Sequence, residues 1–221
     1  MGIAFFGHPA ILQPIKPVKK IFIDLGHHKG QGLREFVPKL GIDHSWPIYC
    51  WEANPNSWKY MDVCPVVDGR PLNVVKIHAA ALDYTGVAEM ALESNNGAND
   101  GWGSSVIPRF KAPGLDHDKK IKVPCIRFAE WLASLACTHI RLGDGCEIHI
   151  KMDIEGSEFR VLRDILHYRR LMTPDGPKLA SMISSLHVEW HERFMQDLDA
   201  AGLKKMLVEK LSQSTEVHNH W

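Results

Sequence analysis

Strand-like apolar runs that alternate with helix-like segments constrain the fold of this 221-residue chain more than any other feature. Runs of this length bounded by turn residues are typical of buried strands. Five of them occur, at Ile21–Leu25, Ile48–Glu52, Val74–Leu82, Ile148–Ile154 and Met182–Trp190. Their alternation with helical segments predicts an α/β fold, with a mostly parallel, twisted sheet flanked by helices.

Three segments between or after these runs have helical spacing. In Gln31–Leu40 the apolar residues fall on one face, although Pro38 is expected to kink or shorten the helix. Ser157–Leu171 shows the same pattern, with Ser157 as a plausible helix start. A further helix is expected from Asp197 to about Leu211. Helices at these places suit the connections of a parallel sheet.

Two more strand-like segments interrupt the alternation. Val87–Leu92 follows a turn and Ile121–Ile126 follows a loop, and we expect them to form an antiparallel embellishment at one edge of the sheet. The intervening Ser94–Gly103 is rich in Asn and Gly, so burial cannot offset its ordering entropy, and we expect it to be mobile without a ligand.

Composition limits the class of protein. The length and 45% hydrophobic content suit a single domain, 1–221, with a core of about 20–211 and an N-terminal lead-in at 1–19. Lys plus Arg equals Asp plus Glu at 26 each, so no nucleic-acid partner is expected. The five cysteines form no CxxC pair, which indicates reduced thiols and a cytoplasmic location. Met1–Leu12 resembles neither a secretory signal nor a membrane span.

A glycine-bearing turn and a carboxylate end the first two strands. Gly26 and Gly30 suit a turn where the backbone passes close to a ligand, although His28 stands where a dinucleotide fingerprint places a third glycine. Glu52, at the end of the second strand, can accept hydrogen bonds from both hydroxyls of a ribose. The alternative is an ordinary turn and a solvated glutamate.

Motifs in the rest of the chain extend this pattern. They are Asp24-Leu25-Gly26 with Gly30, Trp51-Glu52-Ala53-Asn54-Pro55, Ala79–Gly86, Gly103-Ser104-Ser105, Lys151–Glu158 of the form KxDxEGxE, and Glu189-Trp190-His191. In this order the chain resembles the FkbM family of S-adenosylmethionine-dependent methyltransferases over roughly residues 20 to 192. The resemblance implies a class I, Rossmann-like O-methyltransferase that uses S-adenosyl-L-methionine and releases S-adenosyl-L-homocysteine. Its acceptor would be a hydroxyl of a carbohydrate, a glycan or another polyhydroxylated metabolite.

The resemblance also implies a set of cofactor-binding residues. These are Asp24, Gly26, His27, His28, Gly30, Glu52, Ala53, Ala81, Leu82 and Asp153. Ligands of open α/β sheets gather outside the carboxyl ends of the strands, where Asp153, Glu155, Glu189 and His191 are expected to project as catalytic residues. His191 or Glu189 is the expected general base, because imidazole titrates near neutrality and a carboxylate can orient it.

Two other interpretations concern the same residues. In an extended segment His187, Glu189 and His191 share a face, so Glu189 and His191 could bind a divalent metal together with Asp153. His27 and His28 could join such a site or simply shape their turn. Carboxylates at 155 and 158 could equally serve the helix dipole at the helix start that follows.

Substrate contacts are expected from the Asn/Gly-rich loop. Trp102, Ser104 and Ser105 could close over the acceptor, with the indole as a platform for a sugar face; the alternative is a solvent loop whose Trp102 covers the edge strands. After Leu211 no final hairpin of a seven-stranded methyltransferase sheet is visible, and His218 and His220 are expected in an unstructured tail.

Two further functions stay open at this point. The chain could be a nucleic-acid ribose 2′-O-methyltransferase that uses Asp153 and Glu189, although its neutral charge counts against a basic groove. It could also bind S-adenosylmethionine without transferring a methyl group. The sequence sets no oligomeric state.

Overall fold

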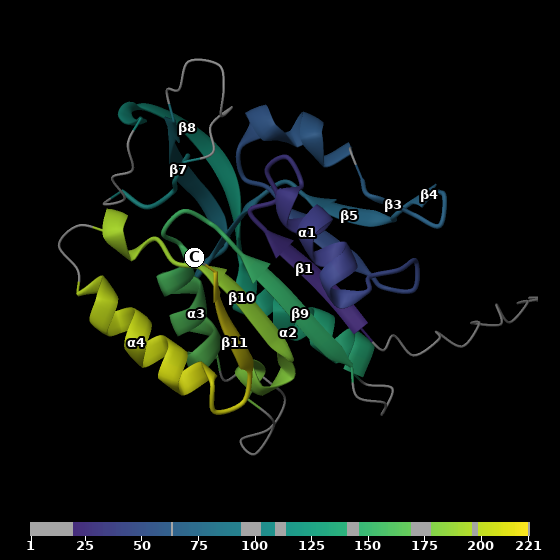
Figure 1. Cartoon of the computed structure of the whole chain (residues 1–221). Coiled ribbons are helices and arrows are strands. Elements are labelled where there is room, and N and C mark those ends of the chain that lie inside the picture. The colour runs from purple at the N-terminus through teal and green to yellow at the C-terminus, as the bar shows by residue number, and fades with distance from the viewer. Residues whose placement is uncertain are drawn as a thin grey trace, which may run out of the picture.

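A computed structural model describes residues 20–62, 64–93, 103–108, 114–140, 146–168, 178–195 and 199–220. Its centre is a six-stranded sheet in which every pair of neighbouring strands is parallel (Figure 1). In spatial order the strands are β11 (Glu216–His220), β10 (Ser185–Glu189), β9 (Glu147–Met152), β1 (Lys20–Leu25), β2 (Ile48–Trp51) and β5 (Val74–Ile77). The chain is therefore α/β with a mostly parallel sheet, compatible with a Rossmann-like fold.

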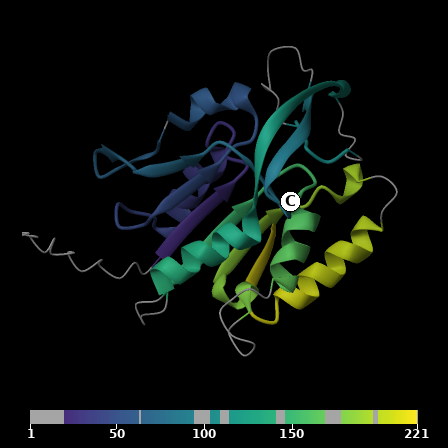
Figure 2. The same ribbon diagram turned by 180° about the vertical axis from the view of Figure 1, so that it is seen from behind.

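Helices cover both faces of this sheet (Figures 1 and 2). On one face lie α1 (Gln31–Leu40) and the 3₁₀ helix η1 (Pro55–Asp62), whose apolar residues pack with Phe22 of β1. On the other face lie α2 (Phe128–Ile140), α3 (Glu158–His167) and α4 (Ala200–Leu211). Successive β1 side chains point to opposite faces, so the strand is buried in two hydrophobic layers at once. Short 3₁₀ helices flank β10, η2 at Leu179–Met182 and η3 at Glu192–Phe194.

A second sheet stands beyond the carboxyl ends of the main strands (Figure 1). It contains β6 (Ala80–Leu82), β8 (Leu115–Arg127) and β7 (Gly86–Glu93) in that spatial order. Strands β7 and β8 pair antiparallel, as the sequence predicted, but with β6 they form a separate sheet instead of extending the main one. A two-stranded hairpin, β3 (Val66–Val67) and β4 (Arg70–Pro71), precedes β5.

The structure corrects several predictions about elements. The run Val74–Leu82 is two strands, because the chain bends at His78 and Ala79 and passes from the main sheet to the second sheet. Helix α1 continues through Pro38, since a proline three residues from the end removes only one of the last hydrogen bonds. The apolar segment that forms α2 was not recognised as a helix.

The C-terminal segment also differs from its prediction. His218 and His220 belong to β11, which pairs parallel with β10, so this part of the chain is not an unstructured tail. The His218 ring stacks on that of His187 with centroids 4.2 Å apart. A parallel strand thus follows α4, where the sequence indicated no further sheet structure.

Other predictions fall on segments that the structure does not describe. The lead-in 1–19, most of Ser94–Gly103, the end of Ser157–Leu171 and the start of Asp197–Leu211 lie outside the described residues. Within the described helices, none is long and apolar enough to cross a membrane.

Candidate functional site

A cavity of about 410 Å³ opens at the carboxyl ends of β1, β2 and β9, where ligands of open α/β sheets bind. The second sheet contributes Ala81 and Met90 to its wall, and α1 contributes Phe36. The cavity therefore lies between the main sheet, its first helix and the sheet that stands above them.

The turn after β1 forms one wall of this cavity. Gly26 has a φ of 78°, and a Cβ atom there would lie 1.8 Å from the main-chain oxygen of Asp153, so no other residue fits without moving the backbone. Gly30, with a φ of 75°, donates its N–H to the carbonyl of His27 at 2.7 Å and precedes α1. The turn is thus held against the end of β9 by direct backbone packing.

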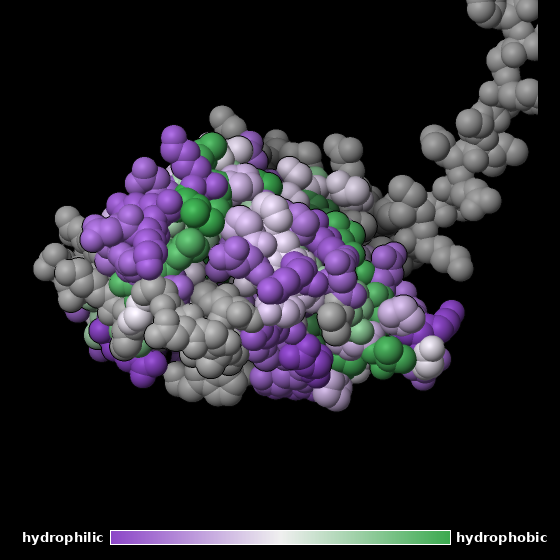
Figure 3. Space-filling model, turned by 90° about the horizontal axis from the view of Figure 1, so that it is seen from above, coloured by the Kyte–Doolittle hydropathy of each residue, from purple (hydrophilic) through white to green (hydrophobic). Residues whose placement is uncertain are grey.

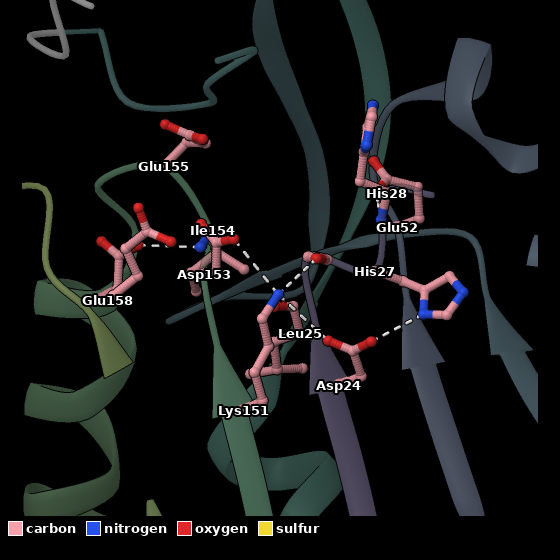
Figure 4. Close-up of polar contacts among 12 residues, drawn as sticks. Asp24, Leu25, His27, His28, Glu52, Lys151, Asp153, Ile154, Glu155 and Glu158 are labelled. Carbon is pink, nitrogen blue, oxygen red and sulfur yellow. Dashed lines mark hydrogen bonds and ion pairs between the residues drawn. The ribbon is translucent and has the colours of Figure 1, made fainter. Parts of the chain in front are cut away.

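Buried charges underlie this turn (Figure 4). Asp24 is fully buried, and its carboxylate accepts a hydrogen bond from Nδ1 of His27 at 2.8 Å. Nζ of Lys151 lies 3.3 Å from Asp24 and 3.4 Å from Asp153, and it donates to the carbonyl of Gly26 at 2.8 Å. Lys151 therefore joins β1, the glycine turn and Asp153 through one ammonium group.

Asp24 and Lys151 each stabilise the charged form of the other. Burial by itself raises the pKa of Asp24, but Lys151 and His27 outweigh it and leave that pKa below its usual value. Burial likewise lowers the pKa of Lys151, but Asp24 and Asp153 reverse the effect and raise it. Both groups stay ionised at neutral pH, so the end of β1 carries a fixed ion pair.

Glu52 lies where β2 ends, on the wall opposite Asp153. Its two carboxylate oxygens accept backbone N–H bonds from His28 at 2.7 Å and Asn54 at 2.6 Å. Burial raises its pKa, and these two N–H groups offset part of that rise. Each oxygen retains a second acceptor position, so the carboxylate could receive two hydroxyl groups from the cavity.

An acidic cluster surrounds His191 at the end of the site that contains Asp153. His191, buried after the end of β10, places Nδ1 at 2.9 Å from the fully buried carboxylate of Glu158. Its Nε2 lies 3.4 Å from Glu155, 3.8 Å from Asp153 and 3.8 Å from Glu189. Four carboxylates from three segments therefore surround one imidazole.

Burial and neighbouring charges strongly raise the pKa values of two groups in this cluster, Glu155 and His191. Burial raises the pKa of Glu155 to about 8, although His191 acts in the opposite direction. Burial lowers the pKa of His191, but its hydrogen bond and charge interactions with Glu158 and Glu155 raise it to about 10. Glu155 also has a φ of 52°, which is uncommon for a residue with a side chain and typical of functional sites.

The segment 103–108 reaches this cluster from the second sheet. The Ser105 hydroxyl donates to the carbonyl of Glu155 at 2.6 Å, and its oxygen accepts from the N–H of Ile107. Ser104 lines the cavity and its hydroxyl accepts the N–H of Glu93. Ser105 is thus a support of the Glu155 turn, whereas Ser104 faces the cavity.

The structure brings most of the predicted site residues together. Those that line the cavity are Gly26, His27, His28, Glu52, Ala53, Ala81, Ser104, Asp153, Glu155 and Glu189. Asp24, Gly30 and His191 lie behind its wall, and Leu82 points into the core of the second sheet. Trp102 lies outside the described residues.

One predicted arrangement is wrong. Because β10 ends at Glu189, His191 is not on the strand and does not share an extended face with His187. His187 packs edge-on against Phe36, on the α1 side of the sheet, while His191 turns toward Glu158.

Two residues of the site were not predicted as such. Lys151 and Glu158 both belong to the KxDxEGxE segment, and Glu158 was assigned no more than a role at the helix start. A lysine in the middle of a buried strand was the available signal, because burial of an ammonium group requires carboxylate partners. Nothing in the sequence pairs Glu158 with His191.

The site defines an α/β protein with a ligand cavity at the carboxyl ends of its parallel strands. Comparison of the chain with protein-family models, with curated proteins and with solved structures finds no match in any of the three.

Proposed function

We propose that this protein is an S-adenosylmethionine-dependent O-methyltransferase that acts on a hydroxyl of a carbohydrate or another polyhydroxylated metabolite. One observation carries the proposal: a single cavity joins the Gly26 turn, the Glu52 carboxylate and Asp153 at the ends of three adjacent parallel strands. The resemblance of these segments to the FkbM family supports the same conclusion.

The walls of the cavity suit the parts of this cofactor. Glu52 offers acceptors for the ribose hydroxyls, and Ala79, Ala80 and Ala81 leave room for a flat base against the backbone. Ser157 also lines the cavity, and its buried hydroxyl has no hydrogen-bond partner within the described part of the chain. A hydroxyl of this kind is suited to the amino-acid end of the cofactor.

When bound, S-adenosylmethionine supplies a sulfonium methyl group for an in-line displacement. The acceptor O–H and the S–CH₃ bonds break, an O–CH₃ bond forms, and the proton passes to a side chain. Asp153, Glu155 and Glu189 line the part of the cavity where an acceptor would enter, and His191 lies behind them. The main tasks of these residues are alignment and proton removal, and the raised pKa of His191 favours Glu189 over His191 as the group that takes the proton.

The face of the molecule seen from above is largely hydrophilic (Figure 3). Hydrophilic residues cover much of the described surface there, and hydrophobic residues form strips between them (Figure 3). The neutral whole-chain charge favours a polyhydroxylated metabolite over a nucleic acid.

Calorimetry with S-adenosylmethionine tests the cofactor assignment. Glu52→Gln should weaken binding by about 10–100-fold, because hydrogen bonds to a charged group contribute about 1.5–3 kcal/mol. Glu89→Gln is the matched control, since Glu89 is exposed on β7, does not line the cavity and should leave the affinity unchanged. Equal affinity of Glu52→Gln and wild type would refute the ribose role.

A labelled-methyl transfer screen over free sugars, glycans and RNA tests the reaction itself. Transfer to a sugar or glycan supports the proposal, and transfer to RNA alone would replace it with ribose methylation of a nucleic acid. Cofactor binding without transfer to any of the three would favour a binding module.

A further inference from the structure

The spacing of the groups around His191 differs from that of a hydrogen-bonded cluster. Nε2 of His191 lies 3.4 Å from Oε2 of Glu155 and 3.8 Å from Oδ1 of Asp153, beyond the usual 2.7–3.2 Å range of N–H···O bonds. Around an ion with bonds of about 2.0–2.2 Å, ligand atoms at tetrahedral angles lie about 3.4 Å apart. His191 and Glu155 therefore have the spacing of two ligands of one ion, and a carboxylate oxygen of Asp153 lies within 4.8 Å of both.

The other ring nitrogen of His191, Nδ1, is held by a hydrogen bond to a carboxylate. Nδ1 donates to the buried carboxylate of Glu158, and the same oxygen of Glu158 accepts the N–H of Ile154 at 2.9 Å. Histidines that bind a metal usually donate their second ring N–H to a carboxylate or carbonyl, which sets the tautomer and the ring orientation. Glu158 thus directs Nε2 toward Asp153 and Glu155.

Charge at this end of the cavity is unbalanced. Asp153, Glu155 and Glu158 contribute three carboxylates, whereas the cations that the structure places against them are His191 and Lys151. Lys151 is shared with Asp24, so its charge is already used at the end of β1. A divalent cation at this end of the cavity would therefore have more carboxylates than cations around it.

A second group of potential metal ligands differs from this one in its burial. Asp24, His27 and Cys50 also lie within 4.8 Å of one another, but all three are buried and Lys151 already neutralises Asp24. Asp153 and Glu155 instead line the cavity and are partly exposed, so an ion can reach them and keep open positions toward the cavity.

We propose that Asp153, Glu155 and His191 bind a divalent metal ion at the acidic end of the cavity, with Glu158 as the outer carboxylate that orients the imidazole. Two carboxylates and one imidazole suit Mn²⁺ or Zn²⁺. This set replaces the combination of Asp153, Glu189 and His191 considered from the sequence, because Glu189 lies outside the group whose atoms are all within 4.8 Å. The role of the ion rests on the proposed function: beside an acceptor hydroxyl it would lower the pKa of that hydroxyl.

Binding of Mn²⁺ alone to the full chain, measured by electron paramagnetic resonance without cofactor or acceptor, tests the site. The wild type should bind one ion. Glu155→Gln should weaken binding by at least the 10–100-fold typical of outer-shell changes, and Glu158→Gln by about that amount. Cys50→Ser and the exposed Glu89→Gln should bind like wild type.

Three results would overturn the proposal: no Mn²⁺ binding by the wild type, unchanged affinity in Glu155→Gln, or loss of binding in Cys50→Ser. Because Glu155 is partly exposed and glutamine has the same shape, circular dichroism should show that Glu155→Gln remains folded. Mn²⁺ binding without cofactor binding would reject only the proposed function, and cofactor binding without Mn²⁺ would reject only the metal site.

Discussion

Two carboxylate–imidazole pairs, at the ends of the two strands that flank β9, have nearly equal geometry and different surroundings. At the end of β1, His27 donates to Asp24 at 2.8 Å; beyond β10, His191 donates to Glu158 at 2.9 Å. The first pair is completed by the ammonium of Lys151, and the second is surrounded by further carboxylates.

This difference gives the first pair a structural role, whereas the second pair lies at the site for which we propose chemistry. Lys151 neutralises Asp24 and fastens the glycine turn through the carbonyl of Gly26, so the first pair holds backbone in place. The second pair leaves Nε2 of His191 facing Glu155 and Asp153 at distances too long for good hydrogen bonds. The same pair of side-chain types therefore stabilises one loop and prepares the other for a cation or a proton.

The largest effect is expected from Lys151→Met. Removing one partner of a buried ion pair leaves Asp24 uncompensated and should lower the free energy of unfolding by about 3–5 kcal/mol, measured by urea denaturation. Lys20→Met on the same sheet is the control, because its pair with Glu147 is partly exposed and should contribute less than about 1 kcal/mol. If the two variants lose similar amounts of unfolding free energy, the buried pair stabilises the fold no more than a surface ion pair does.

A smaller effect, on turnover, is expected from Glu158→Gln. The amide still fills the space and its oxygen can accept the ring N–H, but without the negative charge it attracts that proton less strongly, so methyl transfer should fall about 10–100-fold. Affinity for the cofactor should not change, since Glu158 does not line the cavity. Glu192→Gln, which removes a carboxylate paired with Lys204 next to His191 in the sequence, should keep full turnover.

A result in which Glu158→Gln loses cofactor affinity and keeps its turnover would reverse the roles assigned to the two pairs. The kcat and KM values of this variant, compared with its calorimetric affinity, separate the two outcomes.

The smallest effect is expected from Ser105→Ala. The substitution removes the hydroxyl that donates to Glu155 and accepts from Ile107, which should lower the free energy of unfolding by about 1 kcal/mol. Ser45→Ala, in a surface turn with Asp43, is the control for loss of an exposed hydroxyl and should change stability less. Thermal unfolding of both variants measures the difference; equal shifts would argue against support of the Glu155 turn by Ser105.

Much of the main sheet could be predicted, because the spacing of apolar residues along the chain indicates which positions are buried. All five expected apolar runs contain a parallel strand of the main sheet, and Val74–Leu82 also supplies a strand to the second sheet. The division of Val74–Leu82 between two sheets could not be predicted. Ala79–Leu82 is apolar, and a segment of this kind suits a buried strand in either sheet. Strand β11 was missed because a histidine-containing edge strand has no apolar pattern.

By itself, the sequence determined the α/β alternation, the glycine turn after β1 and the carboxylates at the ends of β2 and β9. These features depend on local chemistry, namely apolar periodicity, the positive φ that Gly26 requires and the position of a charged residue after a buried run. Only the tertiary structure decided the electrostatic partners: Lys151 with Asp24 across 127 positions of sequence numbering, and His191 with Glu158 across 33. Pairing of this kind depends on which strands become neighbours in the sheet, and that order is set by packing of the whole chain and not by any one segment.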